Sequence, residues 1–380
     1  MNTYRRWDLQ PVWGSGARLV DAAGRSYIDC VAGIAVASLG HAHPAVTKAI
    51  TAQASRLVHV SNLYHTDPAE ELAAELAALT GGMHTFLCNS GAEAVEAAIK
   101  LTRKWGRSRG RHVIVAAEGG FHGRTLGALA ATGQPAKRTA FEPLPPGFCH
   151  VPFGDAAALD SAVGDEVAAV LLEPIQGEAG VVMPPEGYLA AAQAACVRAG
   201  ALLILDEVQT GVGRTGAWWA YQHAGVSPDI MCIAKGLAGG LPIGACLAAP
   251  AVAAAFEPGD HGCTFGGGPV QSGAALAVLE IIASEGLLER AKTAGEVMMQ
   301  GLAAIFSDDA DVRGRGLLIG VELPEAKARA VAEAALERGL LVNDATPSVV
   351  RLTPPLVITH DDIQEALEIL EEVAGATGTA

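Results

Sequence analysis

The amino-acid sequence predicts an α/β protein with a mainly parallel central sheet in a large domain and a smaller α+β domain. Short apolar runs at 167–173, 201–206 and 229–234 are bounded by Gly, Pro or charged residues and have the length of buried strands. Segments with helical periodicity, at 92–105 and 188–199, separate runs of this kind. Apolar strands that alternate with helices are typical of a parallel sheet covered on both faces.

Length and composition support a globular protein of two domains. The 380 residues, half of them hydrophobic, can bury a sizeable core. The formal net charge is −15 and the Lys and Arg residues are not clustered, so we expect no nucleic-acid binding. The apolar runs are too short to span a membrane, and the first residues lack the apolar segment of a signal peptide. We therefore expect no membrane association.

Cysteine and histidine usage gives no sign of disulfides or metal. The seven cysteines are odd in number, widely spaced and without a C-x-x-C pair, which favours reduced thiols and a cytoplasmic location. His41 and His43 form an H-x-H pair that can bind a metal, but no further ligands cluster around them. A structural turn is the favoured interpretation, and no metal site is expected.

The other elements can be taken in chain order. Before the first long apolar run we expect strands at 17–20 and 26–30, helices at 44–58 and 68–79, and strands at 85–88 and 112–117. After about residue 275 we expect helices at 274–284, 285–306, 326–338 and 361–373, and strands at 316–322, 340–343 and 349–352.

The change of pattern near residue 275 gives the expected domain boundaries. Residues 1–50 are an N-terminal segment that packs with the small domain. Residues 51–275 form the large domain, which contains the candidate site. Residues 276–380 form the small C-terminal domain.

Ligands of open α/β sheets bind beyond the carboxyl ends of the strands, and two charged residues lie there. Asp206 ends one apolar strand. A helix cap or a structural ion pair would explain it, and so would a pairing with the ring nitrogen of a cofactor. Lys235 directly follows the strand at 229–234 and precedes Gly236. Because burial lowers the pKa of a lysine, Lys235 is a candidate nucleophile.

Two other strand ends are candidates for binding a phosphate, a flat ring or a carboxylate. The sequence NSGA at 89–92 leads into a helix, whose free N–H groups could hold an anion. An ordinary N-cap at Ser90 or Asn89 explains the same pattern equally well. The sequence FHGR at 121–124 offers an aromatic ring for stacking and Arg124 as a carboxylate clamp, with a surface turn as the alternative.

Three loops or late strands add polar side chains. The sequence EPIQGE at 173–178 follows an apolar strand. Arg351, before two prolines, is a second possible carboxylate clamp. Thr264, in a glycine-rich loop, offers a hydroxyl that could meet a phosphate.

Taken together, these segments resemble the class III (ornithine-type) aminotransferases. The resemblance rests on the segments 89–94, 121–124, 173–180, 206–211, 235–236 and 264–267. Each is weak alone, but their order and spacing agree with the family, and Lys235 lies 29 positions after Asp206. The likeness runs from Gly33 to Leu356.

The resemblance implies the type I fold of pyridoxal-phosphate (PLP) transferases and a homodimer with shared active sites. Lys235 would bind PLP covalently and act as a general base, Asp206 would pair with the ring nitrogen, and Gln209 would reach the ring hydroxyl. The residues expected to contact the cofactor are Ser90, Gly91, Ala92, Phe121, His122, Asp206, Val208, Gln209 and Lys235, with Thr264 from the neighbouring subunit. Ala92 stands where the family commonly has threonine, which weakens it as a phosphate contact.

The resemblance also implies which residues bind the substrates. Arg124 would bind the α-carboxylate of N-acetylornithine, and Arg351 that of glutamate, with Glu178 masking Arg351 when the other substrate is present. Tyr64 and Ile34 are further expected substrate contacts. Ornithine-specific members have a tyrosine where this chain has Ile34, which favours an acylated ornithine. The implied reaction passes an amino group from N-acetylornithine to 2-oxoglutarate, in arginine biosynthesis.

Other activities remain open at this stage. Another class III aminotransferase could act on succinylornithine, ornithine, GABA or a modified-lysine donor. A PLP-dependent racemase or decarboxylase could use the same fold. A PLP-binding regulator without turnover usually carries a DNA-binding module, and the sequence has no basic helix-turn-helix segment.

Overall fold

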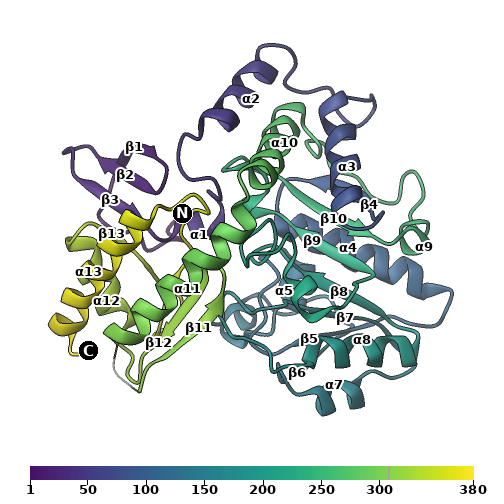
Figure 1. The fold of residues 1–380 in the computed structure, drawn as a ribbon. Helices are drawn as coiled ribbons and strands as arrows, with labels where there is room; N and C mark the ends of the chain where they lie inside the picture. Colours follow the sequence, from purple (N-terminus) through teal and green to yellow (C-terminus); the bar gives the residue numbers. More distant parts are fainter. Residues whose placement is uncertain (307–308) are drawn as a thin grey trace.

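A seven-stranded sheet forms the centre of the larger body of the molecule (Figure 1). The computed structural model describes residues 1–306 and 309–380. The strand order is β4-β10-β9-β8-β7-β5-β6, and only β10 runs antiparallel to its neighbours. The strands are β4 (His84–Cys88), β5 (Val113–Ala117), β6 (Phe148–Val151), β7 (Val167–Leu172), β8 (Leu202–Asp206), β9 (Ile230–Ile233) and β10 (Gly244–Ala248). The prediction of a mainly parallel α/β sheet is confirmed.

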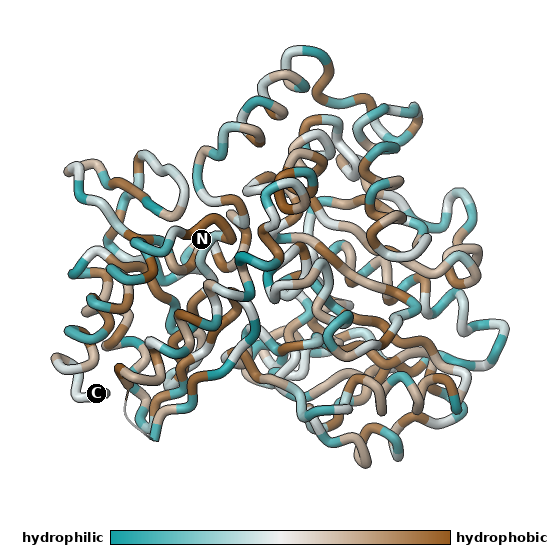
Figure 2. The backbone as a smooth tube through the Cα atoms, viewed as in Figure 1, coloured by the Kyte–Doolittle hydropathy of each residue, from teal (hydrophilic) through white to brown (hydrophobic). Residues whose placement is uncertain are grey.

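Side chains alternate between the two faces of this sheet, and both faces are buried. On β8, Leu202 and Ile204 pack in one apolar cluster with α4, whereas Leu203 and Leu205 pack in the other with α8 and α10. The covering helices are α4 (Gly91–Arg107), α8 (Tyr188–Ala199) and α10 (Pro269–Ser284). Figure 2 shows the hydrophobic stretches along these central strands. Each fully buried leucine or isoleucine contributes about 1.5–3 kcal/mol, so double-sided burial explains why these strands are apolar throughout.

The second body combines the two ends of the chain (Figure 1, left). Its sheets have the orders β1-β2-β3-β13 and β11-β12-β15-β14. Strand β13 pairs in parallel with β3, so that Leu340 lies opposite Ile28. The strands are β1 (Pro11–Ser15), β2 (Arg18–Asp21), β3 (Ser26–Asp29), β11 (Asp311–Arg315), β12 (Leu318–Glu322), β13 (Leu340–Leu341), β14 (Asn343–Asp344) and β15 (Val349–Leu352). The long helices of this body are α11 (Leu287–Ile305), α12 (Ala328–Glu337) and α13 (His360–Thr377).

Other helices, most of them of one or two turns, complete the two bodies. They are α1 (Ala32–Ala35), α2 (Pro44–Ala54), α3 (Asp67–Leu79), α5 (Leu126–Ala131), α6 (Pro135–Arg138), α7 (Ala156–Ala162), α9 (Pro250–Ala253), and the 3-10 helices η1 (Thr139–Phe141), η2 (Ala220–Ala224) and η3 (Lys235–Ala238). His41 forms an isolated antiparallel bridge with Gly16, and its Nε2 atom lies 2.8 Å from the Asp29 carboxylate.

The prediction of a single strand at 340–343 was wrong, because this segment contributes to two strands. The chain leaves one sheet after β13 and enters another at β14, with Val342 between them. A continuous apolar run shows burial but not a change of pairing partner, so the break has no local signal. The sequence also did not predict strand β10. Its sequence GACLA consists mostly of residues that are poor strand formers. Pairing with β4 on one side and β9 on the other holds this segment in an extended conformation.

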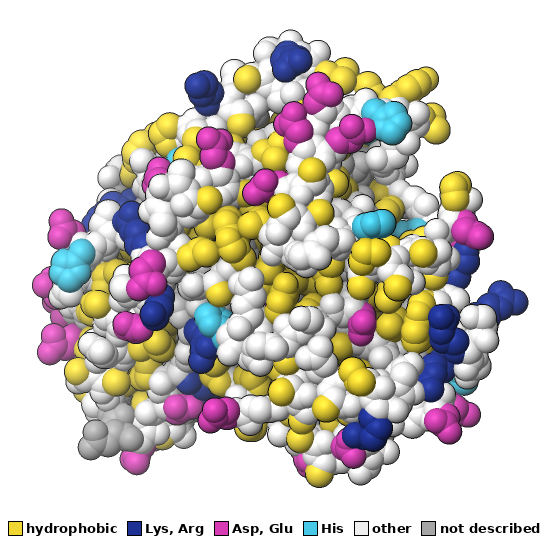
Figure 3. All heavy atoms as spheres, turned by 45° about the vertical axis from the view of Figure 1, so that its right-hand side comes forward, with side chains coloured by type: hydrophobic (Ala, Val, Ile, Leu, Met, Phe, Trp, Pro, Cys, Tyr) yellow, Lys and Arg dark blue, Asp and Glu magenta, His cyan; other side chains and the backbone are white. Residues whose placement is uncertain are grey.

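The surface carries both signs of charge. Figure 3 shows acidic and basic side chains around the edge of one face, with hydrophobic atoms exposed towards its middle. No single helix within 1–306 and 309–380 has both the length and the hydropathy of a membrane span. Helices α10 and α11 meet that test only as a pair, bent by 70°.

Candidate active site

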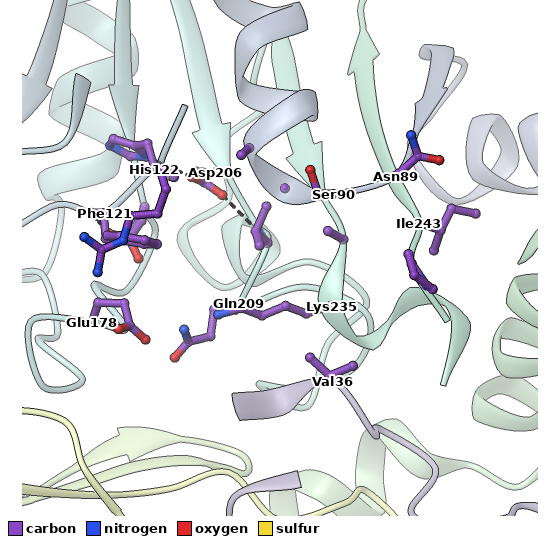
Figure 4. Close-up of a pocket in the computed structure, with 18 of the residues that line it drawn as sticks. Val36, Asn89, Ser90, Phe121, His122, Glu178, Asp206, Gln209, Lys235 and Ile243 are labelled. Atoms are coloured by element: carbon purple, nitrogen blue, oxygen red, sulfur yellow. Dashed lines mark hydrogen bonds and ion pairs between the residues drawn. The ribbon is translucent and has the colours of Figure 1, made fainter. Parts of the chain in front are cut away.

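A cavity of about 410 Å³ lies at the carboxyl edge of the central sheet (Figure 4). Five strand ends contribute to it. Asp206 is the last residue of β8, Glu173 directly follows β7, and Lys235 lies just beyond β9. Ser90 and Phe121 come from the loops after β4 and β5. The parallel direction of these strands brings together side chains that are far apart in the sequence.

The Asp206 carboxylate is fixed by an imidazole and by a backbone amide. Oδ2 of Asp206 lies 2.8 Å from Nδ1 of His122, and the Val208 N–H donates to Oδ1 at 3.1 Å. Both side chains are at most 4% exposed. Burial by itself lowers the pKa of His122, but the hydrogen bond to Asp206 and its charge outweigh burial and raise that pKa. Asp206 is therefore held in one orientation by His122 and the Val208 N–H.

Lys235 lines the cavity at the start of η3. Burial lowers its pKa from 10.5 to about 8, while the nearby Glu178 charge opposes the shift and Arg351 adds to it. Its backbone φ is 25°, in a region that L-residues rarely adopt. The Ser38 hydroxyl donates to the Gly236 carbonyl at 2.8 Å, which ties down the turn after the lysine. A lysine with this pKa is partly neutral near physiological pH and can act as a nucleophile or a base.

Arg351 is buried at the junction of the two bodies. Its side chain is 2% exposed, and Nη1 lies 2.8 Å from the Glu178 carboxylate. The same nitrogen donates to the Gly177 carbonyl at 2.8 Å and to Gln209 Oε1 at 3.0 Å, and Nη2 donates to Asn343 at 2.7 Å. Burial alone would raise the pKa of Glu178, but the charges of Arg351 and Lys235 lower it to about 2. The two groups thus form a charged pair beside the cavity, with Arg351 buried and Glu178 partly exposed.

The N-terminus of α4 faces the cavity with small residues. Ser90 is the N-cap, and its Oγ accepts from the Glu93 N–H at 3.2 Å. Gly91 and Ala92 form the first turn and line the cavity. A Cβ at Gly91 would come within 2.8 Å of both methyl groups of Val208, so only glycine fits without a shift. Free N–H groups at such a helix end favour an anion.

Phe121 and Glu173 shape another wall. The Phe121 N–H donates to Glu173 Oε1 at 2.9 Å, and the Gly177 N–H donates to Oε2 at 3.1 Å. Burial raises the pKa of Glu173 to about 7. The guanidinium carbon of Arg124 lies 5.5 Å from the centre of the Phe121 ring, and the Arg124 side chain is exposed. Arg124 is therefore free to meet a ligand at the mouth of the cavity.

Most of the residues singled out from the sequence line this cavity, and four do not. Ile34, Tyr64 and Thr264 lie outside its lining, and Arg351 reaches it through Glu178 and Gln209. Tyr64 is 70% exposed and lines a second cavity of about 430 Å³, beside the loop that contains Thr264. Near Ile34, it is Val36 that lines the active-site cavity.

Sequence reasoning missed several lining residues. Among them are Val36 and Ile243. Asn89 and Glu173 also line the cavity, and the sequence indicated them only as members of segments that follow strands, without a role of their own. Val36 and Ile243 are apolar residues in loops, and no sequence pattern distinguishes them from other core residues.

Comparisons with known proteins agree with this geometry. A family model described as "Aminotransferase class-III" matches residues 3–374. The chain is 53% identical over 375 residues to acetylornithine aminotransferase from Mycolicibacterium smegmatis, covering 98% of this chain and 95% of the relative. An ornithine aminotransferase structure from Toxoplasma gondii, with partial occupancy of PLP, has a TM-score of 0.96 at 34% identity over 99% of this chain and 92% of that one. N-acetylornithine aminotransferase from Stenotrophomonas maltophilia has a TM-score of 0.85 at 38% identity, covering 98% and 97% of the two chains.

Proposed function

The chain belongs to the class III aminotransferases, which are PLP enzymes, and on this premise we propose that it transfers the δ-amino group of N-acetylornithine to 2-oxoglutarate. The products are N-acetylglutamate 5-semialdehyde and glutamate, and the pathway is arginine biosynthesis. The observation that carries the proposal is one cavity lined by Lys235, whose pKa is lowered, and by exposed Arg124, with buried Arg351 bonded to two of its lining residues. The full-length likeness to acetylornithine aminotransferases supports the choice of donor.

The residues around the cavity fit PLP. A carboxylate fixed by His122 suits a protonated ring nitrogen, and it is available at Asp206. The first turn of α4, where a Cβ at Gly91 would clash with Val208, suits a phosphate. The amine of Lys235 suits an aldehyde. When bound, PLP supplies an electron sink for the carbon next to the reacting nitrogen.

Lys235 has two tasks in this proposal. It would hold PLP between turnovers, and its neutral Nζ would be the base that removes the proton from the δ-carbon of the donor. A base with a pKa near 8 is well matched to proton transfer at neutral pH. Asp206 keeps the ring nitrogen protonated while that proton moves.

The remaining cofactor contacts have distinct tasks. Phe121 and Val208 line the cavity and would pack against the ring of bound PLP. Gln209 accepts from Arg351 through Oε1, which leaves its amide N–H groups to donate to the ring oxygen. Ser90, Gly91 and Ala92 bind the phosphate from the end of α4.

Two arginines divide the carboxylates of the two substrates between them. Arg124, exposed at the mouth, binds the carboxylate of N-acetylornithine. Arg351 binds the α-carboxylate of 2-oxoglutarate or glutamate, once Glu178 has moved away from it. While N-acetylornithine is bound, Glu178 stays paired with Arg351 and neutralises it. Ile34 and Tyr64 contribute to the donor side.

A homodimer in the cytoplasm completes the proposal. Leu63, Tyr64 and Phe265 are large, exposed hydrophobic residues near Thr264, which supports a subunit interface there. In that dimer Thr264 would reach the phosphate bound by the neighbouring subunit. The seven free cysteines suit a reducing compartment. The large domain is proposed to extend from residue 51 to residue 275, between the N-terminal segment and the small C-terminal domain.

An amine-donor screen tests the proposed reaction. The holoenzyme is assayed with 2-oxoglutarate and, in turn, N-acetylornithine, N-succinylornithine, ornithine and GABA, and glutamate formation is measured. We expect the highest kcat/KM with N-acetylornithine. A higher value with any other donor would replace the proposed substrate, and glutamate formation with none of them would refute the proposal.

A further inference from the structure

A second cation, Lys137, contacts the same Phe121 ring as Arg124, although only Phe121 and Arg124 line the cavity. Lys137, on the short helix α6, places its Nζ 4.8 Å from the centre of the Phe121 ring. The Arg124 guanidinium carbon lies 5.5 Å from the centre of the same ring. One aromatic side chain of the site is thus contacted by two positive charges from different segments.

Within residues 1–306 and 309–380, neither cation has a carboxylate within 4.0 Å. Lys137 is half-buried, and burial is the main cause that lowers its pKa. The charge of Arg124 lowers that pKa further, and Glu178 opposes the shift. The ring face offsets part of the repulsion between the two cations. An anion bound between them would offset more.

We propose that Lys137 and Arg124 together form the site for the donor carboxylate, and that Lys137 selects donors whose α-nitrogen is acylated. This inference rests on the proposed function and deepens it. A carboxylate can accept from both cations at once. Lys137 is therefore a substrate-specificity residue in addition to the two arginines already assigned.

The chemistry of the donors explains the selection. N-acetylornithine brings a carboxylate whose neighbouring nitrogen is a neutral amide. Free ornithine brings the same carboxylate with an α-ammonium group one carbon away. Next to a half-buried lysine, that ammonium is repelled by a like charge in a medium of reduced dielectric constant. Glutamate, the donor of the reverse direction, reacts through its own α-amine and so leaves no free ammonium at the mouth.

Three donors separate attraction from repulsion. N-acetylornithine has a carboxylate and a neutral α-amide, ornithine has a carboxylate and an α-ammonium, and 5-aminopentanoate has a carboxylate and no α-substituent. For Lys137→Met we expect kcat/KM to fall about tenfold for N-acetylornithine and 5-aminopentanoate, as for the loss of one charge-assisted contact. For ornithine the lost attraction and the lost repulsion offset each other, so we expect a change of less than about threefold.

Matched variants serve as controls. Lys137→Gln repeats the test with a polar side chain, and Lys137→Arg should restore most of the wild-type preference. Lys292→Met removes a charge from an exposed lysine on α11, far from the cavity lining, and should leave all three kcat/KM values unchanged.

Equilibrium binding gives a readout that does not depend on turnover. N-acetylnorvaline and norvaline have the two kinds of α-substituent but no reacting δ-amine, and their binding to the holoenzyme is followed by calorimetry. We expect Lys137→Met to weaken N-acetylnorvaline about tenfold more than norvaline.

The outcomes separate this inference from the proposed function. Equal changes for acylated and free donors, or no change for either, in both Lys137→Met and Lys137→Gln would overturn the role of Lys137. The kcat/KM values of the wild type for donors with different acyl groups, by contrast, test only which donor is the substrate. If succinylornithine proved to be the better donor, the selection against an α-ammonium group would still be tested by the same ratio.

Discussion

Buried Arg351 and partly exposed Glu178 form an ion pair, with Nη1 and Oε1 2.8 Å apart and the two residues 173 positions apart in the chain. The pair joins the loop after β7 to β15, which belong to the two different bodies. Removing one partner of a buried pair costs about 3–5 kcal/mol because the other charge is left without compensation. In the proposed reaction the pair stays intact while N-acetylornithine is bound, and the α-carboxylate of 2-oxoglutarate takes the place of Glu178 on Arg351.

Glu178→Gln should affect the two half-reactions unequally. Without the negative charge Arg351 is no longer neutralised, so we expect the half-reaction with N-acetylornithine to slow about tenfold. The half-reaction with 2-oxoglutarate should change less than about threefold. Stopped-flow spectra of the two half-reactions measure this directly. Equal slowing of both would show that Glu178 does not act as a switch.

Asp206→Asn should lower kcat by ~10²–10³-fold, because it removes a fixed charge from the ring nitrogen. The substitution also removes the charge that pairs with His122. Because Lys235 and the end of α4 are unchanged, PLP should remain bound, but the enzyme should react poorly. Asp229→Asn is the control, because Asp229 holds the Leu203 N–H on the same sheet at 2.8 Å but does not line the cavity. Turnover of Asp206→Asn close to that of the wild type would contradict the role of the carboxylate.

Attachment of PLP to the apoenzyme should depend on pH with a midpoint near 8. Only the neutral amine of Lys235 attacks an aldehyde, and its fraction rises as pH rises through the pKa, which burial lowers to about 8. The rate of attachment, followed by absorbance, should therefore increase between about pH 7 and 9 and then level off. A rate that keeps rising up to pH 10.5 would mean that Lys235 behaves as an ordinary exposed lysine.

Gly91→Ala should weaken PLP binding about tenfold. The added Cβ would lie 2.8 Å from the Val208 methyl groups, so either the first turn of α4 or the Asp206–Val208 segment must shift. Gly164→Ala is the control, because a Cβ at Gly164 has no heavy atom within 4 Å. Equilibrium dialysis of PLP against both variants gives the comparison, and equal affinities would show that the turn tolerates the shift.

The centre of the site could be predicted from the sequence because the direction of the strands could be predicted. Asp206 and Lys235 each follow an apolar run, and parallel strands end at the same edge of a sheet, so their proximity follows from the pattern. Arg351 was placed near Glu178 only through the family resemblance, since nothing local to β15 indicates which loop it contacts. The sequence therefore predicts which functional side chains lie at the strand ends, but it does not predict the contacts between the two bodies.

Other parts of the site depend on folding details that leave no pattern. Lys137 lies in a four-residue helix after α5, and its approach to Phe121 depends on how that loop folds back. Val36 enters the cavity from α1, where Gly33 and Ile34 have positive φ values. Backbone conformations of this kind arise from tertiary packing, and the sequence alone predicts them only where glycine is present.

Covalent trapping at Lys235 tests the central claim most directly. The holoenzyme is reduced with borohydride, digested, and its peptides are mapped by mass spectrometry, with Lys235→Ala treated in parallel. We predict a single PLP-modified residue, Lys235, in the wild type and no modified peptide in the variant. Modification of a different lysine in the wild type, or an unchanged visible spectrum and label in Lys235→Ala, would contradict the account.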